Sequence, residues 1–218
     1  MITQRRLDQI RLSPRPRGQL LMAELLLRPN YGWPLSPTRI TLEGSEHAPR
    51  GGGAIFVMNH TDRYNYWPFQ YQLYRQGLGF TATWVKGKYY EHPLMARFMD
   101  FMNNIPIPSK GYLLTKDFQA RRGRPPRDEE YAALKRFVDG ELDPAAAAAA
   151  GGPDAAPLCS AAYRDDLEAR FRAMMQRVVA INQQALADGL SLLIFPQGTR
   201  SKRLTRGHTG AAQIALYT

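Results

Sequence analysis

The chain has 218 residues, of which 44% are hydrophobic, 22% charged and 11% aromatic. This length suits one α/β domain, and the composition suits a globular core, which excludes a disordered chain, a collagen and a disulfide scaffold. The sequence contains one cysteine, Cys159, so an internal disulfide and a cysteine-based zinc cluster are both excluded.

Positive charge is concentrated at the two ends of the sequence, whose net charge is +10. Residues 1–50 hold eight basic and four acidic residues, and residues 191–218 hold four basic residues and no acidic one. The 140 residues between them hold 17 basic and 15 acidic residues. Such polarised charge favours an anionic partner, which on charge alone is a nucleic acid, an anionic lipid headgroup or a phosphorylated metabolite.

The N-terminal segment, residues 1–34, is basic and contains an apolar stretch at residues 20–27. Arginines flank this stretch, so as a helix it would lie either on a bilayer with its arginines at anionic headgroups or on the protein core. No run reaches the roughly 18 apolar residues of a membrane span, and the first residues lack the apolar stretch of a secretory signal. We therefore expect a cytoplasmic protein.

Residues 35–218 begin with two predicted strands, at 39–43 and 54–58. The second is a continuous apolar run of the kind that is buried in a parallel sheet. A helix is predicted from Tyr66 to Gly77, where the glycine ends it, and a third strand at residues 80–85.

Two further helices are predicted next, at residues 93–102 and 128–139. Between them, two prolines make residues 105–108 extended, as a strand edge or a loop. The alanine-rich tract at residues 143–157 offers almost no side chain to bury, which predicts a mobile surface loop.

The last part of the chain predicts a long helix followed directly by a strand. Apolar residues from Leu167 to Ala185 recur every three or four positions, which is typical of an amphipathic helix, and Gly189 ends it. Residues 190–195 predict the last strand. The alternation of strands and helices predicts an α/β sandwich, a mostly parallel sheet flanked by helices, in which ligands bind beyond the carboxyl ends of the strands.

One polar segment at such an end contains His60, which follows the strand at 54–58 and precedes a helix. A histidine held in this way is a candidate general base. Asn65 or Asp62 could reach back to its second ring nitrogen and fix the tautomer. The alternative is a histidine that only caps the helix.

A second polar segment, Phe195-Pro196-Gln197-Gly198-Thr199-Arg200-Ser201, follows the last strand. Its turn, glycine, hydroxyl and guanidinium predict a cradle for a phosphate or a carboxylate. Lys202, Arg203 and Arg206 add positive charge to the same segment. The alternative is a solvated basic loop.

Taken together, the two segments resemble the glycerolipid acyltransferase family typified by 1-acylglycerol-3-phosphate acyltransferase. That family has Asn-His-x-Ser-x-x-Asp after a strand and Phe-Pro-Glu-Gly-Thr-Arg-Ser more than a hundred residues later, and Asn59-His60 and residues 195–201 stand here in that order. The resemblance covers about residues 35–218. Lys86 stands where the family has a lysine at a strand end, and Ser109 or Lys110 replaces an arginine of its Gly-x-Ile-Pro-Val-x-Arg stretch.

The resemblance implies transfer of a fatty acyl group from acyl-coenzyme A or acyl carrier protein to a lysophospholipid such as 1-acyl-glycerol-3-phosphate. His60 would be the base, assisted by Asn65 or Asp62. The acceptor phosphate would bind residues that share polar or cationic character: Gln197, Gly198, Thr199, Arg200, Lys86 and Lys110. The family implies no cofactor and no metal, and the four histidines show no metal-site spacing. Its partners would be these substrates and the anionic lipids of a membrane surface on the cytoplasmic face.

The sequence departs from the family at two acidic positions. Asn65 stands where the family has an aspartate, and Gln197 stands where it has a glutamate. Asn65 can orient His60 but cannot stabilise an imidazolium by charge, so a catalytically weakened or non-catalytic relative that binds lipid headgroups is the alternative function. Gln197 keeps hydrogen bonding and removes a negative charge, which predicts a cradle more attractive to phosphate.

Two further expectations concern the rival class and the C-terminus. Net charge and scattered aromatics are the only support for a nucleic-acid-binding protein, and no nucleic-acid motif accompanies them, so we expect no nucleic-acid partner. The family continues into another strand after a helix such as residues 210–216, so we expect the sequence to be truncated at its C-terminus.

Overall fold

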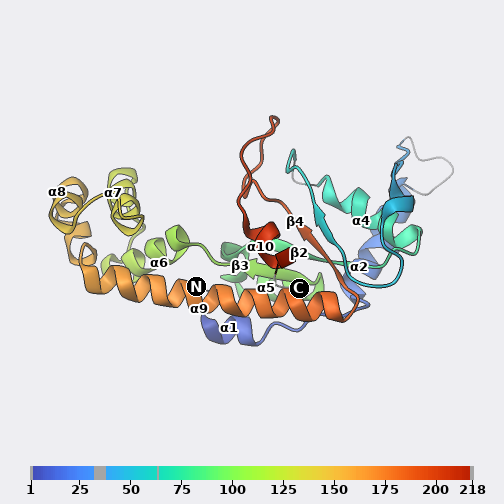
Figure 1. Ribbon diagram of the computed structural model, residues 1–218, viewed down its shortest axis with the longest axis horizontal. Coiled ribbons are helices and arrows are strands. Elements are labelled where there is room, and N and C mark those ends of the chain that lie inside the picture. Colours follow the sequence, from blue (N-terminus) through green and yellow to red (C-terminus); the bar gives the residue numbers. More distant parts are fainter. Residues whose placement is uncertain (1, 32–37, 63, 217–218) are drawn as a thin grey trace. The chain divides into compact units, whose positions relative to one another are not determined.

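The computed structural model describes residues 2–31, 38–62 and 64–216 (Figure 1). Two compact units make up the fold. The sheet unit comprises Gln9–Val85, His92–Ile105 and Val178–Thr218, and the helical unit comprises Met1–Asp8, Lys86–Glu91 and Pro106–Arg177. The predicted boundary between residues 34 and 35 lies outside the described residues, so that division stays a prediction.

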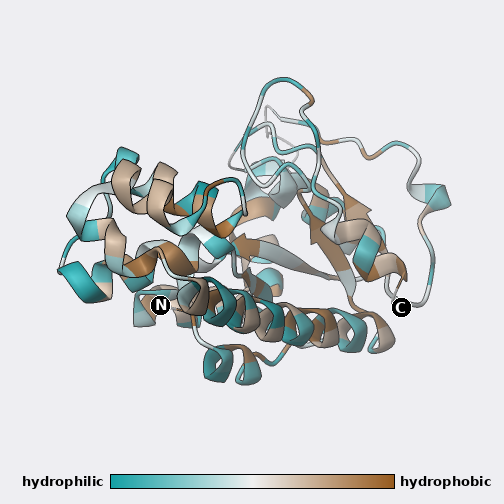
Figure 2. Cartoon of the chain, turned by 60° about the vertical axis from the view of Figure 1, so that its left-hand side comes forward, coloured by the Kyte–Doolittle hydropathy of each residue, from teal (hydrophilic) through white to brown (hydrophobic). Residues whose placement is uncertain are grey.

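A four-stranded parallel sheet confirms the predicted α/β class. Its order is β1 (Ile55–Val57), β4 (Ser191–Ile194), β2 (Thr81–Lys86) and β3 (Asn104–Ile107). Both β1 and β2 pair in parallel with β4, the last strand in the sequence. For example, Ile55 of β1 lies opposite Leu192 of β4. Figure 2 shows the apolar character of the strands.

The two strands that carry the candidate site differ in burial. Every residue of β4 is buried, as expected for a central strand of a parallel sheet. The first strand lies at an edge and Val57 is 54% exposed, so the prediction of a buried strand there is wrong. A continuous apolar run does not distinguish a central strand from an edge strand that is covered on one face.

The helices of the sheet unit are α2 (Arg17–Leu21), the π-helix η1 (Met22–Leu27), α3 (Arg28–Tyr31), the 3-10 turn η2 (Ser45–His47), α4 (Tyr66–Arg75), α5 (Pro93–Phe101) and α10 (Gly210–Leu216). Ala23 and Leu27 of η1 form a buried cluster with Tyr71 of α4. Gly18 of α2 lies directly against the carbonyl group of Phe101, at a position where a Cβ atom would clash. Residues 17–27 therefore pack on α4 and α5.

The helical unit contains α1 (Gln4–Asp8), the 3-10 turn η3 (Gly87–Tyr90), α6 (Lys110–Arg122), α7 (Asp128–Val138), α8 (Pro144–Ala155) and the 3-10 turn η4 (Ala156–Leu158). The long helix α9 (Ala161–Ala187) begins in this unit and ends in the sheet unit. Phe118, Phe137 and Leu167 are fully buried and form part of the helical unit's core.

The alanine-rich tract is a helix and not the mobile loop that its composition predicted. Asp143 caps its start by accepting a hydrogen bond from the Ala146 N–H (2.8 Å), and Pro144 occupies the first turn. Alanine has the highest helix propensity, and its small side chain permits close approach of α7, so Ala147 is fully buried. Gly152, with φ of 72°, kinks the helix.

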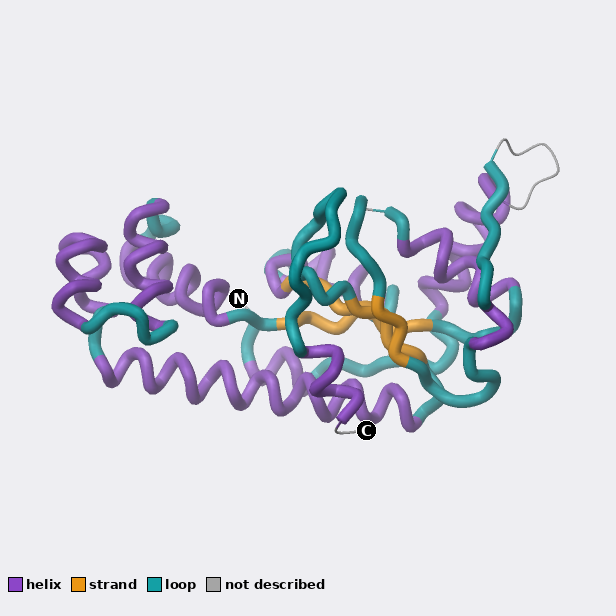
Figure 3. The backbone as a smooth tube through the Cα atoms, turned by 45° about the horizontal axis from the view of Figure 1, so that its top comes forward, coloured by secondary structure: helices purple, strands orange, loops and turns teal. Residues whose placement is uncertain are grey.

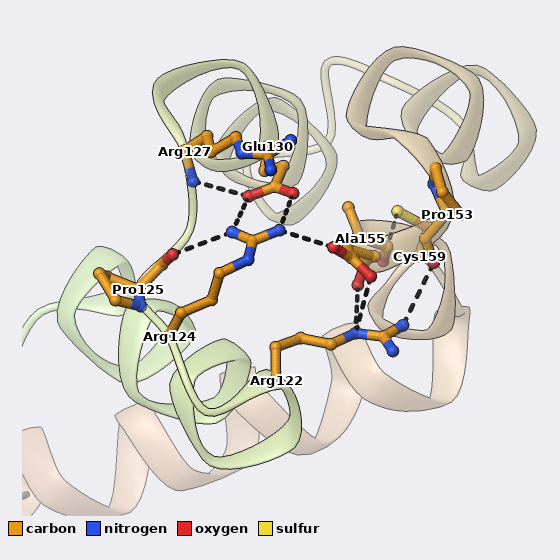
Figure 4. A network of polar contacts seen from close by, with 9 residues as sticks. Arg122, Arg124, Pro125, Arg127, Glu130, Pro153, Ala155 and Cys159 are labelled. Carbon is orange, nitrogen blue, oxygen red and sulfur yellow. Dashed lines mark hydrogen bonds and ion pairs between the residues drawn. The ribbon is translucent and has the colours of Figure 1, made fainter.

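A charged network holds the kinked end of α8 near the start of α7 (Figure 4). Arg124 binds both carboxylate oxygens of Glu130 (2.6 and 2.7 Å) and also Asp154 (2.6 Å). Glu130 additionally accepts the backbone N–H of Arg127 (2.6 Å). Because Arg124 and this N–H stabilise the charged carboxylate, the pKa of Glu130 falls to about 2.

The other predicted helices and the strands at residues 80–85 and 190–195 are confirmed. The predicted strand at residues 39–43 is not. It is an irregular segment, and Gln72 of α4 donates a hydrogen bond to the Ile40 carbonyl (2.9 Å). A side chain thus satisfies a backbone acceptor that a neighbouring strand would satisfy in a sheet. Within the described residues, no helix has the length and apolar character needed to cross a membrane.

Candidate functional site

The two predicted site segments leave the sheet at the same edge, as the parallel pairing of β1 and β4 requires. Beyond the last paired residues, the Met58 N–H donates to the Ile194 carbonyl (3.0 Å). The His60 loop (residues 59–62) then follows β1, and the cradle loop (residues 195–206) follows β4. Figure 3 shows the two loops side by side above the strands.

The cradle loop binds both backbone polar groups of His60. The His60 N–H donates to Oε1 of Gln197 (2.9 Å), and the His60 carbonyl accepts the Ser201 N–H (2.9 Å). The His60 ring also packs on Phe195, with ring centroids 4.4 Å apart. Residues distant in sequence therefore fix the position of the candidate base, which the isolated His60 loop could not do.

Gln197 is a buried part of this arrangement, with 5% of its surface exposed. While its Oε1 accepts from His60, its Nε2 donates to Oγ1 of Thr205 (3.3 Å) within the cradle loop. Both ends of the amide are occupied by protein groups. This geometry favours a role for Gln197 in joining the two loops over its predicted role in binding phosphate.

The two candidate partners of His60 occupy different places. Asn65 Nδ2 donates to the Asn59 carbonyl (3.1 Å) and to Oγ1 of Thr61 (3.0 Å), the two neighbours of His60 in the chain. Asp62 Oδ1 accepts the backbone N–H groups of Tyr64 and Asn65 (2.6 and 2.7 Å), at the start of α4. Asn65 thus supports the His60 loop, whereas Asp62 supports the first turn of the helix.

Residues 198–200 and 202–206 of the cradle loop are exposed at the carboxyl end of the sheet. Gly198, with φ of 64°, allows a turn that the Gly198 N–H closes by donating to the Phe195 carbonyl (3.1 Å). Thr199 and Arg200 follow and are exposed. Among the residues that the structure describes, the four cations Arg200, Lys202, Arg203 and Arg206 form no ion pair with an acidic side chain. Such a cationic, partly backbone-lined loop is suited to binding an anion.

The last two predicted phosphate ligands belong to the helical unit. Lys86 ends β2, and Lys110 begins α6, where its ammonium group pairs with Glu168 (2.6 Å). Their participation in this site stays a prediction.

Sequence reasoning missed three contributors to the site. Thr205 binds Gln197, Phe195 packs on the His60 ring, and His208 lies against Gly198, since a Cβ atom built on that glycine would be 3.5 Å from the His208 ring. Only Phe195 stood inside a recognisable motif. In the parts of the chain that are described, His, Cys, Asp and Glu form no group of three that could hold a metal ion.

The acyltransferase family model matches residues 39–132, a stretch that contains His60, Asp62 and Asn65. Residues 39–132 are therefore similar to the acyltransferase family, the family of 1-acylglycerol-3-phosphate acyltransferase and its relatives. This match supports a general acyltransferase function. Searches of curated proteins and of solved structures found no match to this chain.

Proposed function

We propose that this acyltransferase moves a fatty acyl group from an acyl thioester to the hydroxyl group of a lysophospholipid, of which 1-acyl-glycerol-3-phosphate is the model acceptor. The observation that carries the proposal is the double attachment of the His60 backbone to the cradle loop. It supports a base and an anion-binding loop that are fixed side by side. No cofactor is required, and acyl-coenzyme A or acyl carrier protein serves as donor at the cytoplasmic face of a membrane.

The proposed reaction is a direct transfer. His60 accepts the proton of the acceptor hydroxyl while the hydroxyl oxygen attacks the thioester carbonyl carbon. The tetrahedral intermediate then expels the thiolate by breaking the carbon–sulfur bond, and the imidazolium returns its proton to the sulfur. His60 Nδ1 is buried, so Nε2 is the nitrogen assigned to this proton transfer.

The cradle loop is proposed to bind the acceptor phosphate. Arg200 presents a planar pair of N–H donors, Gly198 allows the backbone to approach closely, and Thr199 adds a hydroxyl. Holding the phosphate there places the acceptor hydroxyl near His60 without the entropy cost of a free encounter.

The alternative function is a lipid-headgroup-binding relative with little or no turnover. Asn65 favours it, because the amide lacks the charge with which an aspartate would stabilise an imidazolium. In this alternative the cradle binds phosphate normally and His60 is a structural residue.

The test replaces His60 by Ala in the full chain and measures turnover of lysophospholipids with a labelled acyl thioester. We expect a loss of about 10²- to 10⁴-fold in kcat, the usual contribution of a general base, with headgroup binding unchanged. Headgroup binding without turnover in the unmodified protein would support the alternative. Equal turnover of the variant and the unmodified protein would refute His60 as the base.

A further inference from the structure

The chain returns on itself after the last strand and closes a loop. The His208 N–H donates to the Pro196 carbonyl (2.7 Å), and a Cβ atom built on Gly207 would be 3.1 Å from Cβ of Pro196. The two ends of the segment at residues 196–208 therefore lie against each other. We define the arc as residues 199–206, which project between these ends before the chain enters α10 (Figure 1).

The arc is exposed and strongly positive. Every residue of it except Ser201 is exposed, and Leu204 near its middle is 78% exposed. It contains no acidic residue and four cations, Arg200, Lys202, Arg203 and Arg206. Like charges so close together repel one another, and a bound anion removes this repulsion. An anion should therefore stabilise the arc in the arrangement that binds it.

Both hydrogen bonds that join the arc to the rest of the sheet unit, among the described residues, lead to His60. The Ser201 N–H donates to the His60 carbonyl (2.9 Å). At the other end of the arc, Oγ1 of Thr205 accepts from Nε2 of Gln197 (3.3 Å), whose Oε1 accepts the His60 N–H (2.9 Å). The position of the arc and the position of the candidate base are therefore coupled.

Thr205 connects the cations of the arc to the support of the base. In the sequence it stands between two of these cations, since Arg203 precedes it by two residues and Arg206 follows it. An anion that draws Arg203 and Arg206 together fixes the residue between them, and with it the hydroxyl that Gln197 binds. Displacement of the arc would remove the acceptor of Nε2 in the buried Gln197, which is costly. Because coupling is reciprocal, the anion and the base support stabilise each other.

We infer that a phosphate bound by the arc activates His60, and that Thr205 is the positioning residue that transmits this effect. This role rests on the function proposed above and gives the acceptor phosphate a second task besides attachment. Phosphate favours the arrangement in which Gln197 and Ser201 hold His60, so it raises kcat as well as lowering KM. The phosphate need not belong to the acceptor for this effect.

The test measures transfer from a labelled acyl thioester to monoacylglycerol, an acceptor without phosphate, by the full chain. Inorganic phosphate should raise kcat about tenfold over chloride, the gain expected when the supported arrangement has a population of about 10% without an anion. Chloride is used at equal ionic strength, so that screening of charge is the same in both solutions. An unchanged kcat would overturn the activating role, because phosphate would then serve attachment alone.

Thr205→Val tests the transmitting residue, because valine keeps the branched shape and removes the hydroxyl. Activation by inorganic phosphate should fall from about tenfold to about twofold, a fivefold loss that is usual for one hydrogen bond. With a phosphate-bearing acceptor, kcat should fall by about the same factor with a smaller change in KM, since Thr205 is not itself a phosphate ligand. Thr205→Ser keeps the hydroxyl and should behave as the unmodified chain. Thr209→Val is the matched control, because Thr209 is exposed and lies outside the arc.

Hydrogen exchange gives a readout that needs no turnover. Inorganic phosphate should slow backbone exchange in both the arc and the His60 loop, and Thr205→Val should weaken the protection of the His60 loop more than that of the arc. Protection of both loops without turnover of any acceptor would retain the coupling and refute the proposed acyl transfer. Protection of the arc alone in the unmodified chain would overturn the coupling, even if the variant fails to fold. Equal protection in a folded Thr205→Val and in the unmodified chain would overturn the role of Thr205.

Discussion

Arg124 and Arg200 show two different uses of the same side chain. Arg124 is bound to two carboxylates, Glu130 and Asp154, in a network whose every named member has a protein partner (Figure 4). Arg200 is exposed in a loop without an acidic residue, together with three other cations. The first arrangement has its acidic partners within the fold, whereas the second concentrates positive charge that has no acidic partner among the described residues.

The difference shows why net charge is a poor guide to function in this chain. Arg122, Arg124 and Arg170 of the helical unit are paired with acids, so they stabilise helix contacts and attract little from solution. The cations of the cradle loop lack such partners among the residues that the structure describes, and the backbone of the loop is tied to His60. Arrangement, and not the number of charges, distinguishes a stabilising network from a candidate binding site.

The largest effect is expected where the cradle loop is attached to His60. Gln197→Leu would leave the His60 N–H without its acceptor and lower kcat by about 10²-fold, because a small displacement of a base is costly. It should also destabilise the fold by about 1–3 kcal/mol, the cost of an unsatisfied buried donor. Turnover and urea unfolding would be measured together.

Gln197→Glu is the matched control for that experiment. A carboxylate oxygen can accept from the His60 N–H, and the Thr205 hydroxyl can donate to the other oxygen, so kcat should be retained. A loss of kcat equal to that of Gln197→Leu would show that position 197 needs the neutral amide itself, and thus that it does more than hold the loop.

The next effect concerns the support of the His60 loop. Asn65→Ala should lower kcat by about tenfold, since two hydrogen bonds to the loop are lost, each contributing about 0.5–1.5 kcal/mol. Asp62→Asn keeps an oxygen for the backbone N–H groups of the first turn and should change kcat less. The opposite order would identify Asp62 as the partner of His60.

A smaller effect should separate a phosphate site from diffuse charge. Arg200→Lys keeps the net charge but loses the paired donors, so KM should rise about tenfold for acceptors that carry a phosphate and remain unchanged for those without one. Arg203→Ala and Arg206→Ala should raise KM less. If KM rose equally for all three arginine variants, with the same salt dependence, the cradle would be only a diffuse charged surface.

The smallest effect is expected in the complete network of the helical unit. The pKa of Glu130 is about 2 in the folded protein and lies below its ordinary value of 4.5, so the charged carboxylate favours the folded state. This contribution is full above about pH 4.5 and is lost as the pH falls toward 2. The urea midpoint should therefore decrease over that window, and Glu130→Gln should flatten this part of the profile. Glu129→Gln, at an exposed neighbour, should leave it unchanged.

Local patterns predicted three of the four strands, four of the helices and the positions of the two loops of the site, since periodicity and strand ends are properties of adjacent residues. They failed where the outcome depended on a distant partner. The alanine-rich tract is ordered because α7 covers it, and Gln197 points inward because His60 offers it a backbone N–H. Residue type alone assigned the tract to a loop, whereas the phosphate-binding role predicted for Gln197 stays a prediction.

The central position of β4 has a consequence for how the chain folds during synthesis. Ile55 of β1 and Ala82 of β2 both face Leu192, which leaves the ribosome after both. Until then each strand lacks its principal neighbour and presents unpaired backbone groups, a state that is slow to resolve and open to association with other chains. His60 and Gln197 are 137 residues apart, so the candidate base acquires its support among the last events of folding. A ribosome that pauses before residue 191 would hold a nascent chain in which the His60 loop is already made and its contacts with the cradle loop do not yet exist.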